Sequence, residues 1–426
     1  MGTPAEYRAL VDQLYALKPR GGRLGIDRMR PLAAALGNPE RTLPVVHVAG
    51  TNGKGSVAAM VEAMLRAAGW RVGLYTSPHL VHLGERVQVN RERLTDDEIV
   101  TFVAELTSVS EQIEAEQGAE MRPSFFEWMT AMAFLKFARA RCDIAVIEVG
   151  LGGEFDATNI VEPEVSVITS IGLDHCEWLG NSMEEIARAK AGIIKPGRPV
   201  VIGRMPPAAE RVIREIAERK SARCVSVREV FGEDIEAYPR PILAGVYQRW
   251  NAGTAVLAAR TLDERWRITD EIIGKGLASA AWPGRWEARE VGGRTLILDA
   301  SHNAEGAETL QANLAQLRAE TGKQPIVVLG VLGEERASPL LEAICRHARA
   351  IHLIEPRDVR AVAVERLQSL VPREFSGAVI PDRVARLFPG GGTCEAGEAG
   401  DIVVVTGSIY SLGEVMARLE RSSETR

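Results

Sequence analysis

The chain has 426 residues, beyond the roughly 250–300 at which a single hydrophobic core stops growing, so two domains are expected. Its 46% hydrophobic and 25% charged residues exclude a chain that is disordered over most of its length. With 51 basic and 57 acidic residues and a formal net charge of −6, it shows no basic stripe of the kind that binds nucleic acid, and we expect no nucleic-acid partner.

The five cysteines are widely spaced, and no two of them form a C-x-x-C pair. A disulfide framework or a zinc knuckle is therefore not expected, and a reducing compartment suits the chain. The N-terminal stretch lacks the apolar core of a signal peptide, and no run of about 18 apolar residues could cross a bilayer. We expect a cytoplasmic monomer with no membrane partner.

Short apolar runs alternate with longer helical patterns over the first part of the chain. We predict buried strands at 43–49, 71–75, 143–149, 164–169 and 199–202, and helices at 56–68 and 125–139. Because runs rich in β-branched residues and separated by helices are typical of parallel strands buried on both faces, this pattern predicts an α/β fold with a mostly parallel sheet.

The alternation starts again near residue 294, with strands predicted at 295–299, 325–329, 350–354 and 401–405. These runs indicate a second, smaller α/β unit with a Rossmann-like pattern. The Pro283-Gly284 pair is typical of a connection between domains. We therefore predict a first domain of residues 1–283 and a second of residues 284–426.

The strongest local signal follows the first predicted strand, in the run Gly50-Thr51-Asn52-Gly53-Lys54-Gly55-Ser56. Its glycines let the backbone curl and aim N–H groups inward, and the start of the next helix favours phosphate. Lys54 can place a charge on the outer phosphates of a nucleotide. The run predicts a P-loop that binds ATP. Its spacing differs from G-x-x-x-x-G-K-[ST], so a tightly packed strand–helix turn is the alternative.

Further motifs follow this loop in order along roughly residues 20–415. Together they resemble the folylpolyglutamate synthase and dihydrofolate synthase family of the Mur ligase superfamily. The motifs are Tyr75-Thr76-Ser77-Pro78-His79-Leu80, Glu85-Arg86-Val87, Glu148-Val149-Gly150-Leu151-Gly152-Gly153, Asp156-Ala157-Thr158-Asn159, Gly172-Leu173-Asp174-His175, Ile186-Ala187-Arg188-Ala189-Lys190-Ala191-Gly192-Ile193, Gln248-x-x-Asn251-Ala252, Pro283-Gly284-Arg285, Asp299-x-x-His302-Asn303 and Gly407-Ser408-Ile409-Tyr410.

The resemblance implies an Mg²⁺ ion that bridges the ATP phosphates and is held by Ser77 and Glu148, whose oxygens suit this cation. It also implies a second Mg²⁺ near His175 and a carbamylated Lys190. Lys54, His175 and Lys190 are then the expected catalytic residues. Without the resemblance, Ser77 is a turn residue, His175 a packed loop histidine and Lys190 a solvated helix lysine. A monovalent cation such as K⁺ is a further expected cofactor.

Three more positions resemble contacts to the nucleotide, namely Asn251, Arg285 and Asp299. An arginine can fork onto phosphate, and an aspartate can accept from ribose hydroxyls or orient the arginine. A surface salt bridge is the alternative for Arg285.

The remaining candidates concern the two other substrates. His302, Ser408 and Tyr410 resemble positions that handle the incoming glutamate. Phe125, Phe126 and the 153–158 loop with Asp156 are candidates for the folate-type acceptor, because a flat aromatic ligand suits an aromatic pocket. Ordinary packing in a helix core is an equal alternative for both phenylalanines. Glu154-Phe155 departs from the Arg-Leu of many relatives.

These motifs predict an ATP- and Mg²⁺-dependent ligase that joins L-glutamate to dihydropteroate, to folates or to both, through an acyl phosphate. Its partners would be small molecules only. The alternatives are an enzyme restricted to one of the two steps, a cell-wall Mur ligase, and a nucleotide-binding module without ligation. Cell-wall enzymes carry a further domain before the loop, whereas only 49 residues precede Gly50 here.

Overall fold

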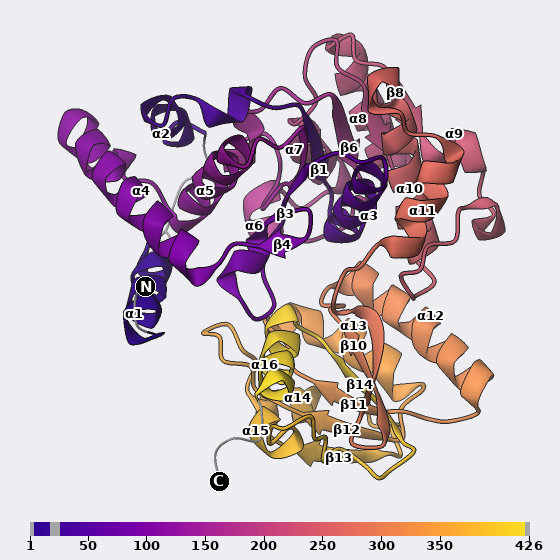
Figure 1. Ribbon diagram of the computed structural model, residues 1–426. Coiled ribbons are helices and arrows are strands. Elements are labelled where there is room, and N and C mark those ends of the chain that lie inside the picture. Colours follow the sequence, from indigo (N-terminus) through magenta and orange to yellow (C-terminus); the bar gives the residue numbers. More distant parts are fainter. Residues whose placement is uncertain (1–3, 18–25, 422–426) are drawn as a thin grey trace. The chain divides into compact units, whose positions relative to one another are not determined.

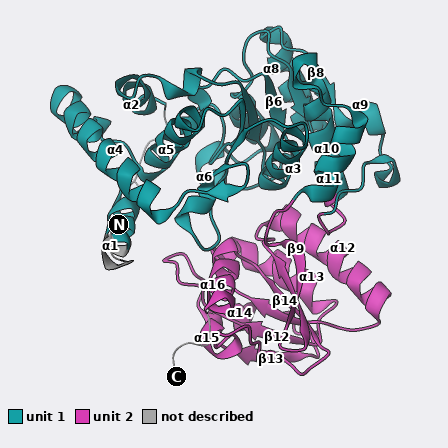
Figure 2. Ribbon diagram, viewed as in Figure 1, with its two compact units in different colours: residues 1–242, 249–280 teal, residues 243–248, 281–426 magenta. Residues whose placement is uncertain are grey.

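The computed structural model describes residues 4–17 and 26–421 (Figure 1). Their contacts divide the chain into two compact units, which Figure 2 colours separately. Unit 1 comprises residues 1–242 and 249–280, and unit 2 comprises residues 243–248 and 281–426. The domains predicted from the sequence, 1–283 and 284–426, differ from these units by the segment 243–248 and by residues 281–283, and their limits stay a prediction.

Unit 1 contains an eight-stranded sheet. Its strands are β1 (Val45–Ala49), β2 (Val72–Tyr75), β3 (Val87–Val89), β4 (Glu92–Arg93), β5 (Ile144–Glu148), β6 (Val165–Ile168), β7 (Val200–Ile202) and β8 (Cys224–Ser226). They lie in the order β4-β3-β2-β5-β1-β6-β7-β8. Every neighbouring pair is parallel except β2–β3 and β3–β4, so β3 alone runs against the other strands. The mostly parallel sheet and its five predicted strands are confirmed. β3, β4 and β8 were not predicted.

Helices cover both faces of this sheet (Figure 1). Side chains of α5, α7 and α8 pack on one face, and α3 packs against β1, β2 and β5 beside α11. The helices are α1 (Pro4–Ala16), α2 (Met29–Ala35), α3 (Lys54–Ala67), α4 (Asp96–Gln117), α5 (Phe125–Arg139), α6 (Cys176–Leu179), α7 (Met183–Ala191), α8 (Pro207–Arg219), α9 (Val227–Phe231), α10 (Gln248–Thr261) and α11 (Asp270–Ser279).

Local sequence explains where the helices near the site begin. Ser124 and Ser182 cap α5 and α7 in capping boxes with the glutamates three residues later. α3 begins at Lys54, two residues earlier than the predicted helix, because Gly53 takes the left-handed conformation with φ +83° and serves as its N-cap. None of the described helices is both long and apolar enough to cross a membrane.

The parallel strands β1, β2, β5 and β6 all end at the same edge of the sheet. The loops that follow them, 50–53, 76–79, 149–156 and 169–175, therefore gather at this edge. Ligands of open α/β sheets bind at the carboxyl ends of the strands. The phosphate loop, Ser77, Glu148 and His175 all belong to these strand ends.

Unit 2 contains a six-stranded sheet in the order β13-β12-β11-β14-β10-β9, in which β9 alone runs antiparallel to its neighbour. The four predicted strands are confirmed as β10, β11, β12 and β14. The elements are β9 (Arg285–Val291), β10 (Arg294–Asp299), α12 (Ala304–Thr321), β11 (Ile326–Leu329), α13 (Ala337–Cys345), β12 (Ala350–Leu353), α14 (Val364–Leu370), β13 (Ala378–Pro381), α15 (Val384–Leu387), β14 (Ile402–Thr406) and α16 (Ile409–Glu420).

Candidate active site

The predicted phosphate loop joins β1 to α3 and needs glycine at two positions. Gly50 has φ +151°, and a Cβ there would lie 1.9 Å from Thr169 Oγ1. Gly53 has φ +83°, and a Cβ there would lie 2.3 Å from Asn251 Oδ1. The second contact places the predicted nucleotide residue Asn251 directly over the loop. α10 therefore brings a side chain against the loop, and the role of Asn251 toward a nucleotide stays a prediction.

Hydrogen bonds tie this loop to the end of β6. Thr51 N donates to Ser170 O over 2.9 Å, and the Thr51 hydroxyl donates to Gly172 O and accepts from Gly172 N. Thr169 Oγ1 donates to Asn52 O over 2.6 Å, and Asn52 N donates to Ser170 Oγ over 3.1 Å. The backbone of the loop is thus held in place before any ligand arrives.

Thr169 and Ser170 were not among the predicted site residues. Their position in the sequence could have indicated them, because these two hydroxyl residues lie at the end of a predicted strand, where ligands of α/β proteins bind. Their partners in the loop lie more than a hundred residues earlier in the chain. Residue type alone therefore did not single them out.

Two lysines converge on one carbonyl of the loop. Lys54 Nζ donates to Gly50 O over 3.1 Å and to Thr51 O over 3.0 Å. Lys190 Nζ reaches the same Gly50 O over 2.8 Å from the last turn of α7, and its residue is only 5% exposed. The two lysines place two positive charges beside the loop, and this arrangement favours an anion there. A solvated helix lysine, which was the alternative interpretation of Lys190, does not agree with this burial.

Ser77 and Glu148 are adjacent, at the ends of the neighbouring strands β2 and β5. The Ser77 backbone N–H donates to Glu148 Oε2 over 3.1 Å, and Glu148 is 4% exposed. A hydroxyl and a buried carboxylate form a hard-oxygen pair that fits Mg²⁺. No three His, Cys, Asp or Glu side chains of the described residues gather as a metal cluster. Mg²⁺ suits such a sparse site, because it keeps several waters and binds phosphate oxygens.

His175 lies at the same sheet edge, in the loop after β6. It has φ +52° and precedes α6. Its side chain is 39% exposed, with Nε2 3.9 Å from Asp174 and Nδ1 4.0 Å from Glu177. The loop that carries it also binds Thr51. Its predicted role at a second metal stays a prediction.

The acceptor candidates lie in the segments after β5 and at the start of α5. Asp156 is 2% exposed, and its carboxylate accepts from the backbone N–H groups of Gly150, Leu151 and Thr158 over 2.9–3.1 Å. Burial raises the pKa of this carboxyl, and these hydrogen bonds act against the rise. Asp156 therefore shapes the loop from within. A contact to the acceptor stays a prediction.

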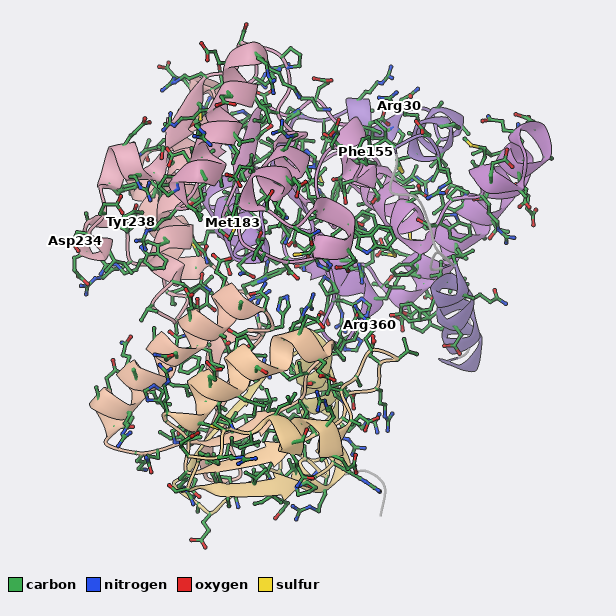
Figure 3. All side chains as sticks on the ribbon, turned by 180° about the vertical axis from the view of Figure 1, so that it is seen from behind. Arg30, Phe155, Met183, Asp234, Tyr238 and Arg360 are labelled. Atoms are coloured by element: carbon green, nitrogen blue, oxygen red, sulfur yellow. The ribbon has the colours of Figure 1, made fainter. Side chains whose placement is uncertain are left out.

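The two phenylalanines have different surroundings. Phe125 is 6% exposed, with the Tyr15 ring 5.3 Å away and the Arg86 guanidinium 5.2 Å from its centroid. Phe126 is half-buried and covers Gly150, where a Cβ would lie 2.3 Å from the ring. Of the two, Phe126 is the better placed to meet a ligand at the strand ends. Phe155, which belongs to the 153–158 loop and is labelled in Figure 3, is 55% exposed.

In unit 2, the predicted nucleotide residues Arg285 and Asp299 pair across β9 and β10. Asp299 is 1% exposed, accepts from Ser301 N over 3.1 Å and lies 3.5 Å from the Tyr247 hydroxyl. Burial raises the pKa of the Asp299 carboxyl, and the Arg285 charge acts against the rise. A buried carboxylate with an arginine opposite suits the predicted pairing of these two side chains.

The glutamate candidates follow β10 and β14, which are neighbours in the sheet of unit 2. His302 Nδ1 lies 2.8 Å from Ala300 O, so this nitrogen carries the proton and donates. Ser408 caps α16 by accepting from Tyr410 N over 3.1 Å. Tyr410 is 37% exposed, and the guanidinium of Arg360, labelled in Figure 3, lies 5.6 Å from its ring. Their roles toward glutamate stay predictions.

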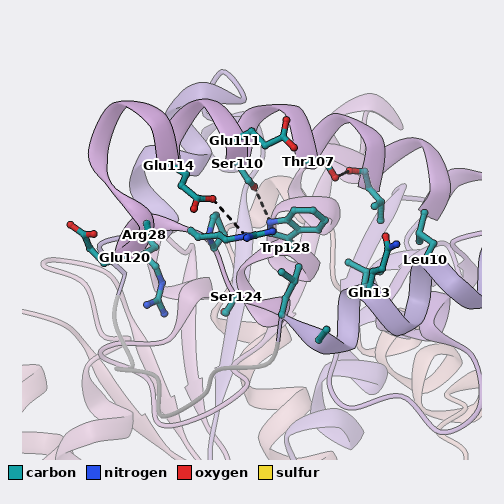
Figure 4. A pocket seen from close by; sticks show the side chains of 17 residues that line it. Leu10, Gln13, Arg28, Thr107, Ser110, Glu111, Glu114, Glu120, Ser124 and Trp128 are labelled. Atoms are coloured by element: carbon teal, nitrogen blue, oxygen red, sulfur yellow. Dashed lines mark hydrogen bonds and ion pairs between the residues drawn. The ribbon is translucent and has the colours of Figure 1, made fainter.

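A cavity of about 660 Å³ also opens in unit 1, between α1, α4 and α5 (Figure 4). Arg28, Ser124 and Trp128 line it, and the Trp128 indole N–H donates to Ser110 over 3.0 Å. None of the predicted substrate residues lines this cavity. We therefore do not assign it to the reaction.

The comparisons with known proteins cover both units. The Mur ligase middle domain matches residues 48–236, and the Mur ligase glutamate ligase domain matches residues 284–409. The dihydrofolate synthase/folylpolyglutamate synthase of Bacillus subtilis is 37% identical to this chain, over 94% of the chain and 96% of the relative. The chain belongs to the folylpolyglutamate synthase/dihydrofolate synthase family.

Solved structures of this family agree in fold. Escherichia coli FolC in complex with DHPP and ADP has a TM-score of 0.81 and 30% identity, and the match covers 96% of each chain. The bifunctional folylpolyglutamate synthase/dihydrofolate synthase of Yersinia pestis, with AMPPNP and a Mn ion, has a TM-score of 0.79 and 29% identity over 97% of this chain and 98% of that one. The predicted family and fold class are confirmed.

Proposed function

We propose that this chain joins the amine of L-glutamate to the carboxylate of dihydropteroate, of a folate or of both, with ATP and Mg²⁺ and through an acyl phosphate. Membership of the family makes it an ATP-dependent, amide-forming ligase. The observation that carries the proposal is the convergence of Lys54 and Lys190 on the Gly50 carbonyl of the phosphate loop, at the sheet edge that also holds Ser77 beside Glu148.

The chemistry follows from the difficulty of the reaction. A carboxylate does not acylate an amine at neutral pH, because oxide is a poor leaving group. Transfer of the γ-phosphoryl group of ATP to the acceptor carboxylate replaces oxide by phosphate. The glutamate amine then attacks the carbonyl carbon, and phosphate departs from the tetrahedral intermediate. No protein nucleophile is needed, so positioning and charge stabilisation carry the rate.

The residues of the loop serve the first step. Its tethered N–H groups and the start of α3 hold the phosphates, and Lys54 turns from the loop carbonyls onto the outer phosphates. When bound at Ser77 and Glu148, Mg²⁺ neutralises charge on the transferred phosphoryl group. Asn251 closes the loop from α10. The Mn ion bound with AMPPNP in the Yersinia pestis relative supports a divalent metal in this family.

We extend the proposal to a second Mg²⁺ near His175, with Lys190 carbamylated. Carbamylation replaces the ammonium by a carbamate, whose anionic oxygens could hold a metal while its single Nζ–H could still donate to Gly50 O. The proposal also includes three predictions made from the sequence. The protein binds a monovalent cation such as K⁺, is located in the cytoplasm and is a monomer.

We place the acceptor by Phe126 and the loop shaped by Asp156. DHPP bound in the Escherichia coli relative supports a pterin-type acceptor. In unit 2 we assign the incoming glutamate to His302, Ser408 and Tyr410, and further nucleotide contacts to Arg285 and Asp299.

An assay of ADP release with glutamate tests the proposal, with dihydropteroate and tetrahydrofolate compared as acceptors. We expect release that requires both glutamate and an acceptor, and we expect Lys54→Ala to abolish it with either acceptor. Turnover with one acceptor alone would identify a single-step enzyme. ADP release independent of glutamate, or no release with any folate-type acceptor, would contradict the proposal.

A further inference from the structure

A buried hydrogen-bond chain joins the strand of the phosphate loop to the acceptor loop. His47, in the middle of β1, is fully buried, and its Nε2 lies 2.8 Å from Thr158 Oγ1. Thr158 Oγ1 in turn lies 2.5 Å from Asp156 Oδ1. Three side chains from two separate segments of unit 1 thus form one continuous contact.

The direction of this chain is fixed by chemistry. A carboxylate only accepts, so the single hydroxyl proton of Thr158 goes to Asp156. Thr158 Oγ1 must then accept from His47, which places the imidazole proton on Nε2. His47 Nδ1 is buried and has no hydrogen-bond partner among the described residues. Burial first, and then the charge of Lys195, lowers the pKa of His47 to about 3. The imidazole therefore stays neutral, and the chain persists across the physiological pH range.

The far end of the chain lies next to the predicted metal ligand. The second oxygen of Asp156 accepts from Gly150 N over 3.1 Å and from Leu151 N over 2.9 Å. These residues follow Glu148 by two and three positions. These hydrogen bonds therefore hold the turn after β5 in a fixed position relative to β1. This turn includes Gly150, which Phe126 covers.

We propose that His47 and Thr158 are positioning residues: through Asp156 they hold the 150–158 loop in the shape that receives the acceptor. The proposal rests on the proposed function, because it takes this loop as part of the acceptor site. A buried polar network that merely stabilised the fold would affect all substrates alike. A positioning network affects the acceptor more than ATP or glutamate.

Steady-state kinetics of Thr158→Val test this inference. Valine keeps the volume of threonine and removes the hydroxyl, so His47 loses its acceptor and Asp156 loses a donor. We expect the KM for the acceptor to rise about tenfold or more, as when an outer partner of a site residue is removed. The KM values for ATP and glutamate should stay within about twofold, and Thr158→Ser, which keeps the hydroxyl, should recover most of the loss.

Two further variants keep the test decisive. His47→Phe removes the hydrogen-bond donor and keeps an aromatic ring. It should raise the KM for the acceptor by a smaller factor and leave the other two KM values unchanged. This variant still tests the inference if Thr158→Val does not fold. Ser226→Ala is the matched control. It removes another buried hydroxyl that accepts a hydrogen bond, at β8 on the far edge of the same sheet, and should leave all three KM values unchanged.

Three results would overturn the inference. They are an unchanged acceptor KM in a folded Thr158→Val or His47→Phe protein, a parallel rise of all three KM values, and a rise of the acceptor KM in Ser226→Ala. Failure of the proposed function looks different, because the unmodified protein would then show no glutamate-dependent ADP release.

Discussion

At residue 53 the backbone requires glycine for two separable reasons. The first is the left-handed φ of +83°, which costs a residue with a Cβ about 1–2 kcal/mol. The second is Asn251 Oδ1, which would lie 2.3 Å from that Cβ. Gly37 shares the first reason, with φ +82°, but has no atom within 4 Å of the added Cβ. The pair therefore separates backbone strain from disruption of the nucleotide site.

We predict that Gly53→Ala weakens binding of ATP with Mg²⁺ at least about tenfold, which corresponds to about 1.4 kcal/mol. Gly37→Ala should lower the free energy of unfolding by a similar amount, because of the same backbone strain. Its affinity for ATP should equal that of the unmodified protein. Isothermal titration calorimetry and thermal unfolding of both variants check this. Equal ATP affinity in the two variants would show that the contact between Gly53 and Asn251 does not shape the nucleotide site.

At the scale of single residues, the sequence indicates which residue types could form a site, but it does not indicate which residues contact each other. The glycines and Lys54 form a local pattern whose physics is readable without the fold. The contact of Lys190 with Gly50 O spans 140 residues, and the chain from His47 to Thr158 spans 111. Such partners depend on strand order and register, which residue types alone do not specify.

Among the elements, the segment from Ser77 to Arg86 depends on one carboxylate. Glu85 accepts the backbone N–H groups of Leu80, Val81 and His82 over 2.7–3.0 Å. This segment leaves β2 at the predicted metal ligand Ser77. Its fold therefore determines where the Ser77 hydroxyl points.

We predict that Glu85→Ala raises the Mg²⁺ concentration for half-maximal activity about tenfold, because the segment that carries Ser77 loosens. The KM for glutamate should not change. Titration of activity with Mg²⁺ measures this. Glu229→Ala is the control, since it removes the carboxylate of the capping box of α9, away from the site. An unchanged Mg²⁺ requirement in a less stable Glu85→Ala protein would restrict Glu85 to a structural role.

Buried parallel strands were predictable, whereas the two edge strands of unit 1, β4 and β8, were not. The buried strands β1, β5 and β6 carry four or five consecutive buried residues and stood out in the sequence. β4 has two exposed residues and β8 three residues that are not all buried, so neither produces a hydrophobic pattern. The segment held by Glu85 has no periodicity, because a side chain rather than a ladder satisfies its N–H groups.

For the whole molecule, the two α/β units follow from two successive series of strands and helices. The first unit is not continuous in sequence, since residues 243–248 belong to the second. The single boundary predicted at the Pro283-Gly284 pair cannot describe a chain that enters unit 2 at residues 243–248 and then returns to unit 1. The proposed reaction has two steps: a phosphoryl group activates the acceptor carboxylate, and the glutamate amine then displaces phosphate.

Isotope transfer tests that claim most directly. The acceptor, dihydropteroate or tetrahydrofolate, carries ¹⁸O at both oxygens of its reacting carboxylate and is incubated with ATP, Mg²⁺ and glutamate. If that carboxylate is phosphorylated, the oxygen bonded to phosphorus leaves with it when the amide forms. Mass spectrometry should then find one ¹⁸O in the phosphate released for each amide bond made. Unlabelled phosphate released alongside the amide product would contradict an acyl-phosphate intermediate.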